Sequence, residues 1–203
     1  MKLEPPFRRA AKEDARRIAE LFRISSGGVA DYVWSTMRDD YPGLSLLDIG
    51  ARRYARENTP FSYQNCVVAE RDGRGVIGML VAFPMAADIP APDEAEEPDS
   101  SGGEPDVLSP YSELEVPGSY YVCGVALVPE ARGEGLGTAF MEIARAEALE
   151  RGLLTLSLLV FEQNVGAVRL YERLGYRVID RRPVVPHELI HYTGDVLLMA
   201  ALA

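Results

Sequence analysis

Three glycines at alternate positions, Gly133, Gly135 and Gly137, follow an apolar stretch that stops at Pro129 and precede a long amphipathic segment. Glycine lets a backbone approach a ligand closely, so such a turn leaves its N–H groups free to donate to an anion. The start of the following helix adds a partial positive charge, and Arg132 adds a full one. Residue types and spacing therefore predict a site for a ligand that contains a pyrophosphate.

Two common phosphate-binding turns fit these residues poorly. A P-loop closes with Gly-Lys-Ser/Thr, and its lysine reaches the terminal phosphates, whereas Gly137 is followed directly by Thr138. A dinucleotide-binding turn would use Gly133, Gly135 and the small residue at 138, with Glu162 near the position of a ribose-binding acid. Only 41 residues follow Glu162, too few for the parallel half-sheets of that fold, so this alternative is disfavoured.

A third type of turn has the spacing Arg-x-x-Gly-x-Gly, which Arg132, Gly135 and Gly137 match. The apolar stretch 125–129 before it is similar to a central strand that ends at proline. A second stretch, 164–176, reads Asn-Val-Gly-Ala-Val-Arg-Leu-Tyr-Glu-Arg-Leu-Gly-Tyr and starts about 30 residues after the turn. In both stretches, and in their spacing, the chain resembles the GNAT superfamily of acyl-CoA-dependent N-acetyltransferases.

The resemblance implies acetyl-CoA as the co-substrate, with no metal, and assigns its contacts. The pantetheine arm would run along the central strand near Ala126 and Leu127, where the Leu127 N–H would polarise the thioester carbonyl. Asn164, with Ala167 three residues on, would hold the pantetheine from the opposite side, and Tyr171 would protonate the departing thiolate. The residues assigned to the pyrophosphate are Arg132, Gly133, Glu134, Gly135, Leu136, Gly137 and Thr138.

The base that deprotonates the acceptor amine is not fixed by the resemblance. Family members often place a glutamate on the central strand about six residues before the position of Leu127, and here that position is Tyr121. Three candidates stay open: Glu115 acting through water, His187, and Tyr121 itself, with bulk water as a fourth. Less favoured polar groups nearby are Glu113, Cys123 and His191.

Length and composition favour a single domain over residues 1–203, since 47% of the residues are apolar and domains usually run about 100–200 residues. The first six residues contain acid and proline where a signal peptide would be apolar, and no stretch is long and apolar enough for a membrane span. We therefore expect a cytoplasmic protein without a membrane partner. Cys66 and Cys123 lie in stretches that we place second and fourth in the sheet, so they are expected to be too far apart for a disulfide.

Most of the negative charge lies in one segment. Residues 88–106 contain eight acids and no lysine or arginine, so they account for eight of the ten excess negative charges of the chain. The segment is rich in proline and poor in apolar residues, which predicts a mobile acidic loop. It is either a solvated insertion or a region that attracts a cationic amine. Nucleic acid is disfavoured as a partner, because it requires a basic face.

Hydrophobic periodicity and turn residues divide the chain into elements. The stretches 119–128 and 154–161, joined by a helix, predict a right-handed parallel crossover buried on both faces. The fold class expected with the resemblance is α/β (α+β): a mixed, mostly antiparallel sheet of six to seven strands that splays at a central parallel pair, flanked by about four helices. The expected strands are 3–9, 65–70, 76–83, 119–128, 154–161, 176–182 and 194–201, and the expected helical segments are 11–25, 29–37 with 46–57, 135–151 and 167–173.

The resemblance implies an N-acetyltransferase that moves an acetyl group from acetyl-CoA to a primary amine of a small molecule or peptide, by direct attack in a ternary complex. The alternative is a CoA-binding module without transfer chemistry, which the missing strand carboxylate favours. We expect the acceptor pocket to be walled by residues 27–37, with Tyr32, Trp34 and Tyr41. A homodimer paired through the apolar run 196–199 is a further expectation.

Overall fold

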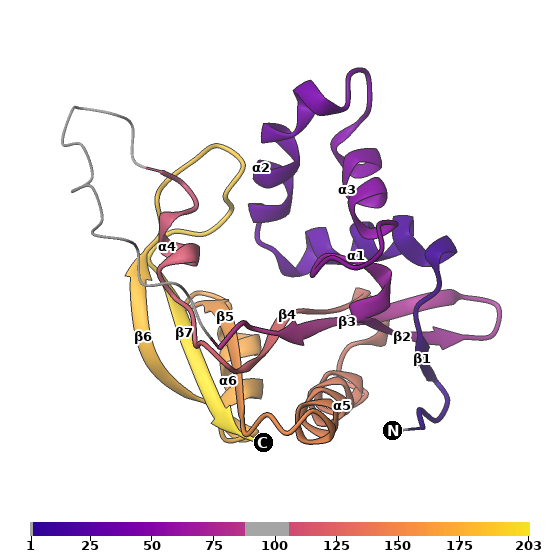
Figure 1. The fold of residues 1–203 in the computed structure, drawn as a ribbon, viewed down its shortest axis with the longest axis vertical. Helices are drawn as coiled ribbons and strands as arrows, with labels where there is room; N and C mark the ends of the chain where they lie inside the picture. Colours follow the sequence, from indigo (N-terminus) through magenta and orange to yellow (C-terminus); the bar gives the residue numbers. More distant parts are fainter. Residues whose placement is uncertain (1, 88–105) are drawn as a thin grey trace.

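The computed structural model describes residues 2–87 and 106–203, and its centre is a seven-stranded sheet (Figure 1). The strands are β1 (Phe7–Arg9), β2 (Cys66–Arg71), β3 (Gly75–Pro84), β4 (Tyr120–Leu127), β5 (Thr155–Phe161), β6 (Arg177–Pro183) and β7 (Asp195–Leu202). Their order is β1-β2-β3-β4-β5-β7-β6, and every neighbouring pair is antiparallel except β4 and β5. The expected sheet with its central parallel pair is confirmed. The predicted acidic loop, 88–106, lies outside the described residues apart from Asp106.

Helices cover both faces of the sheet. In the described residues they are α1 (Ala15–Ser25), α2 (Val29–Thr36), α3 (Leu46–Tyr54), α4 (Ser109–Ser112), α5 (Leu136–Glu150) and α6 (Val165–Arg173), with 3-10 turns at Lys12–Asp14, Arg38–Asp40, Tyr63–Asn65 and Pro129–Ala131. Helices α1, α2 and α3 lie on one face, and α5 and α6 pack on the other (Figure 1). The number exceeds the four or so expected because α2 and α3 are separate helices and α4 is too short to show a period. No helix in these residues is both long and apolar enough to cross a bilayer.

Three apolar clusters of the described residues hold these layers together, and the two larger ones lie on opposite faces of the sheet. Successive residues of a strand point to opposite faces, so Tyr120 and Val122 of β4 pack into the core under α5, where Phe140 is fully buried. Tyr121 and Cys123 point the other way and pack against the core under α1, α2 and α3. The side of β4 that faces α1–α3 is therefore the side that can present chemistry.

The sheet opens between its two parallel strands. Pairing between β4 and β5 covers only three residue pairs, from Tyr120 with Leu156 to Val122 with Leu158. At the same place β4 contains a bulge against β3: Val81 pairs with Gly124 and Ala82 with Val122, which leaves Cys123 as the extra residue. A bulge bends its strand and increases the twist, so residues 123–127 turn away from β5. The expected splay between the parallel strands is confirmed.

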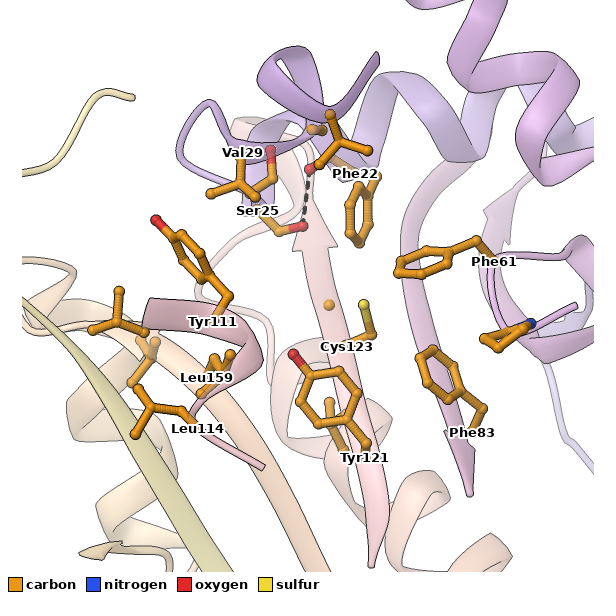
Figure 2. A pocket seen from close by; sticks show the side chains of 18 of the residues that line it. Phe22, Ser25, Val29, Phe61, Phe83, Tyr111, Leu114, Tyr121, Cys123 and Leu159 are labelled. Carbon is orange, nitrogen blue, oxygen red and sulfur yellow. Dashed lines mark hydrogen bonds between the residues drawn. The ribbon is translucent and has the colours of Figure 1, made fainter. Parts of the chain in front are cut away.

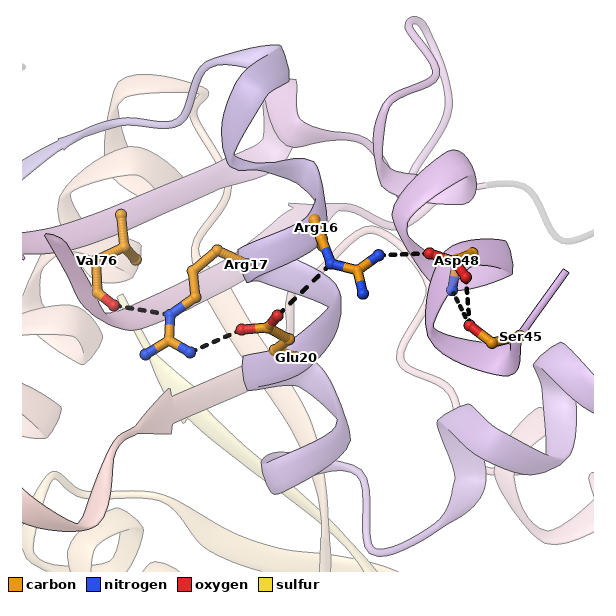
Figure 3. Close-up of polar contacts among 6 residues, drawn as sticks. All are labelled: Arg16, Arg17, Glu20, Ser45, Asp48 and Val76. Carbon is orange, nitrogen blue, oxygen red and sulfur yellow. Dashed lines mark hydrogen bonds and ion pairs between the residues drawn. The ribbon is translucent and has the colours of Figure 1, made fainter.

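Arg16 and Arg17 fix the first and third helices to each other and to the sheet (Figure 3). Arg16 of α1 forms an ion pair with Asp48 of α3, and Arg17 donates from Nε to the carbonyl oxygen of Val76 in β3 at 2.9 Å. Glu20 accepts from Arg17 at 2.8 Å and faces Arg16 at 3.9 Å. Exposed ion pairs contribute little stability individually, but this network fixes the placement of α1 and α3 over β3 and β4.

Two expectations about single residues have opposite outcomes. Cys66 and Cys123 are both free thiols, on strands with β3 between them, as predicted. The prediction that 196–199 forms a free sheet edge is wrong, because β7 is paired with β5 on one side and β6 on the other. That run is apolar because it is buried inside the sheet, which leaves β1 and β6 as the outer strands.

Candidate active site

A cavity of about 770 Å³ occupies the opening between β4 and β5 (Figure 2). This volume lies within the usual range for small-molecule sites, about 300–1,000 Å³. Its wall includes Phe22 of α1 and Trp34 of α2 on one side of the sheet and Tyr171 of α6 from the other. Because the sheet is split at this point, one cavity reaches elements that pack on opposite faces.

The free edge of β4 presents backbone groups to this opening. Val128 donates its N–H to the carbonyl oxygen of Ile77 at 2.9 Å, so Val128 faces β3. Backbone groups alternate in direction along a strand, and Leu127 therefore turns its N–H and C=O away from β3. The side chain of Arg132 donates from Nε to the Leu127 carbonyl oxygen at 3.3 Å, which agrees with that direction. By the same alternation, the backbone groups of Ala126 face β3.

The glycine turn after β4 has the conformation and the open space that a phosphate requires. Gly133 and Gly135 have φ values of 79° and 84°, a left-handed conformation that other residues rarely adopt. A Cβ placed on either glycine would meet no atom within 4 Å. Gly135 caps α5 without a side-chain hydrogen bond, so the N–H groups of Leu136, Gly137 and Thr138 in its first turn lack helical partners. The residues present therefore fit a pyrophosphate.

The glutamate of the turn has a separate role. Glu134 accepts hydrogen bonds from Arg71 at the end of β2, and this pairing holds the pKa of its carboxyl group below the usual range. The ion pair fastens the turn to the β2–β3 hairpin and neutralises a charge that would repel phosphate. Arg132 stays exposed beside the turn.

Asn164 lies at the start of α6, directly after β5, and so at the same edge of the sheet as the turn after β4. Its side-chain oxygen accepts a hydrogen bond from the Ala167 N–H at 3.4 Å, which caps the helix. Both residues line the cavity. The parallel strands thus deliver the two sequence signatures to one end of the opening.

Tyr171 points its ring into the cavity wall from α6 and is 8% exposed. Burial raises the pKa of its phenol to about 12, because the low-dielectric surroundings disfavour the anion. The hydroxyl is therefore protonated at neutral pH and available as a donor.

The three residues proposed as the base, and the less favoured Glu113, differ in position. Tyr121 and Glu115 line the cavity, whereas Glu113 and His187 are not among its lining residues. Burial raises the pKa of Tyr121 well above its usual value, and nearby Cys123 and Glu115 raise it further, so its phenol is neutral. Glu115 is exposed and is the one carboxylate in the cavity wall of the described residues.

His187 and Glu113 are held in contacts away from the cavity. The His187 Nδ1 accepts from the Leu189 N–H at 3.1 Å, and its ring meets Tyr32 edge-on at 4.7 Å between centroids. Glu113 forms an ion pair with Arg182 at 2.9 Å. Residues 2–87 and 106–203 contain no group of three or more His, Cys, Asp or Glu side chains that could hold a metal.

The expected pocket wall is partly right and incomplete. Trp34 lines the cavity, but Tyr32 and Tyr41 do not. Sequence reasoning missed Arg53 and Tyr54 at the end of α3, which do line it. A signal existed: Arg53 follows Ile49 by four residues, so a cation lies on the buried stripe of an amphipathic helix.

Comparisons with known proteins agree with this geometry. Among curated relatives, the mycothiol acetyltransferase of Parafrankia sp. (strain EAN1pec) is 35% identical over 124 residues, which cover 61% of this chain and 34% of that protein. The mycothiol acetyltransferase of Thermobispora bispora is 49% identical over 59 residues, 29% of this chain and 19% of that protein. The chain thus spans about a third and a fifth of the length of these relatives.

Solved structures share the fold. An N-acetyltransferase from Staphylococcus aureus Mu50 has a TM-score of 0.59 at 17% identity and covers 96% of this chain and 99% of its own. A protein from Salmonella typhimurium, solved with its cofactor acetyl-CoA, has a TM-score of 0.56 at 16% identity and covers 97% of this chain and 92% of its own. The family model described as acetyltransferase (GNAT) family matches residues 30–176, and on that match the protein belongs to the GNAT acetyltransferase family.

Proposed function

We propose that the protein is an acetyl-CoA-dependent N-acetyltransferase that acetylates a primary amine by direct attack in a ternary complex. Acetyl-CoA supplies the acetyl group as a thioester. One observation carries the proposal: Val125, which shares the backbone direction of Leu127 two residues on, and the protonated phenol of Tyr171 line the same cavity.

Each group has a defined task in this proposal. The first-turn amides of α5 and Arg132 bind the pyrophosphate, and the free edge of β4 pairs with the extended pantetheine. The Leu127 N–H donates to the thioester oxygen as negative charge develops on it, the type of contact whose loss typically costs about 10²–10³ in rate. The amine nitrogen forms a bond to the carbonyl carbon while the carbon–sulfur bond breaks, and Tyr171 gives its proton to the thiolate.

The acceptor must also lose a proton. Among the described residues that line the cavity, Glu115 is the one with a carboxylate. Because it is exposed at the cavity wall, we propose that it takes the amine proton through water. Tyr121 and His187 serve less well in this role, since the buried Tyr121 phenol stays neutral and His187 packs against Tyr32.

Two measurements on the full chain test the proposal. Thermal-shift titration with CoA and acetyl-CoA reports binding, and thiol release over a panel of amines, including the acceptor of the mycothiol acetyltransferases, reports transfer. Release of CoA thiol with at least one amine supports the proposal. Stabilisation by acetyl-CoA without thiol release on any amine would instead identify a CoA-binding module.

A further inference from the structure

Among residues 2–87 and 106–203, the cavity wall contains one cation that no carboxylate pairs with. Arg53, at the end of α3, lines the cavity, and none of the ion pairs in the described residues includes it. Its guanidinium lies over the ring of Phe61, 4.1 Å from the centroid, and its Nη1 contacts Met37 Sδ at 3.6 Å. Burial lowers the pKa of Arg53, which reports the cost of holding a charge there without a carboxylate.

A second polar group beside it also lacks a partner. Tyr54 is 1% exposed and lines the same cavity, and its buried hydroxyl has no hydrogen-bond partner within the part of the chain that the structure describes. Buried polar atoms are nearly always satisfied in native proteins, and an exception calls for a missing partner. Both side chains line the cavity, and the charge of Arg53 acts on the Tyr54 hydroxyl, so two groups able to donate lie near each other at the end of α3.

The other residues of the cavity wall indicate which chemical group could pair with Arg53 and Tyr54. Among the described lining residues, Arg53 and Glu115 are the two charged side chains, and most of the others are apolar or aromatic. In Figure 2, Phe61 and Leu114 lie on opposite sides of Cys123. Arg53 lies over the Phe61 ring, and Glu115 follows Leu114 in the sequence. A ligand with an amine, an apolar body and an anionic group would match Glu115, the apolar wall and Arg53 respectively.

From these contacts we propose, on the basis of the function proposed above, that the acceptor is an amino carboxylate with an apolar side chain, whose carboxylate pairs with Arg53 and accepts from the Tyr54 hydroxyl. The planar fork of a guanidinium matches a carboxylate with two parallel hydrogen bonds. The amine of the same molecule is the group that receives the acetyl.

Matched acceptor pairs test this assignment. L-phenylalanine and 2-phenylethylamine, and L-leucine and 3-methylbutylamine, differ only by the carboxylate. With saturating acetyl-CoA, kcat/KM from thiol release should be higher for each amino acid by on the order of 10- to 100-fold, the range of one charge-assisted hydrogen-bonded pair. Arg53→Met should abolish this preference, and Arg53→Lys should keep part of it.

Arg52→Met is the matched control, because Arg52 is the neighbouring arginine, is exposed and does not line the cavity. It should keep the wild-type preference. Equal kcat/KM within each pair, or a preference that survives in Arg53→Met, would overturn the proposal.

A binding measurement separates this proposal from the function it rests on. Calorimetry of each amino acid against CoA-loaded protein needs no transfer. Binding that is lost in Arg53→Met supports the carboxylate site even if no amine is acetylated, in which case the transferase proposal alone fails. Absence of binding by both amino acids, or equal binding in wild type and Arg53→Met, refutes the carboxylate site.

Discussion

Replacing Gly135 by alanine tests whether the glycine turn holds phosphate. Gly135 has a φ of 84°, and an added Cβ would meet nothing within 4 Å. The change therefore costs backbone strain without a clash, about 1–2 kcal/mol for a left-handed L-residue. At about 2–4 °C per kcal/mol for a domain of this size, the unfolding midpoint should fall by roughly 2–8 °C. The fold should survive.

The effect on CoA should be much larger than on folding. The new methyl group lies in the open space where the pyrophosphate would approach the first-turn amides of α5. Loss of one charge-assisted hydrogen bond costs about 1.5–3 kcal/mol, so the Kd for CoA should rise on the order of 10- to 100-fold. Calorimetric titration at matched temperature measures the Kd, and a calorimetric scan measures the midpoint.

Gly152 provides the control at the other end of the same helix. It has a φ of 71°, and a Cβ there would also meet nothing within 4 Å. Gly152→Ala should therefore lower the midpoint by a similar amount and leave the Kd for CoA unchanged. If the two variants bound CoA equally well, the amides of this turn would not be the pyrophosphate site.

Three further predictions concern single side chains. Tyr171→Phe should lower turnover on the order of 10²–10⁴-fold with little change in CoA affinity. Because burial raises the pKa of Tyr171 to about 12, wild-type turnover should show no alkaline loss from this group until near that pH. Equal turnover in both proteins would remove Tyr171 from the mechanism. Cys123 is half-buried, and desolvation raises its pKa to about 12. It should therefore react with iodoacetamide at pH 8 more than about 100-fold more slowly than a free thiol, as mass spectrometry of the labelled peptide would show. Labelling as fast as a free thiol would contradict the raised pKa. Asp14→Asn should destabilise the protein by about 1 kcal/mol at pH 7, because a hydrogen bond from Arg8 holds the Asp14 pKa below its usual value. That stability is present above the unfolded pKa of about 3.9 and is lost as pH falls through the folded pKa. Denaturant curves of variant and wild type should therefore converge in acid and differ at neutral pH.

Local signals predicted most of the elements. Ser45 caps α3 by accepting the Asp48 N–H at 3.2 Å, at the predicted start of that helix. Gly73 and Gly75 adopt positive φ values in the short turn between the predicted strands 65–70 and 76–83. The crossover from β4 through α5 to β5 was visible because two apolar strands flanked an amphipathic helix. These features depend on residues close in sequence, where propensity and periodicity act.

Features set by tertiary contacts were not predictable. The bulge at Cys123 depends on the register of β4 against β3, which no local pattern specifies. His187 has the right chemistry for a base, yet the Leu189 N–H and the Tyr32 ring hold it away from the cavity. The role of Arg53 depends on how α3 packs on α1 and α2, which turns this side chain toward the cavity. Residue types predicted the candidate site residues, and tertiary packing decides which of them line the cavity.

The short ladder between β4 and β5 has a consequence for the lifetime of the molecule. Three residue pairs join the half of the sheet that begins at β1 to the half that ends at β6. An extended acyl-CoA bound between β4 and β5 would contact both halves of the sheet and hold them together. Any molecule that binds only the folded chain shifts the folding equilibrium toward the folded state. Degradation of the protein by proteases should therefore be slower when the acyl-CoA is abundant and faster when it is scarce.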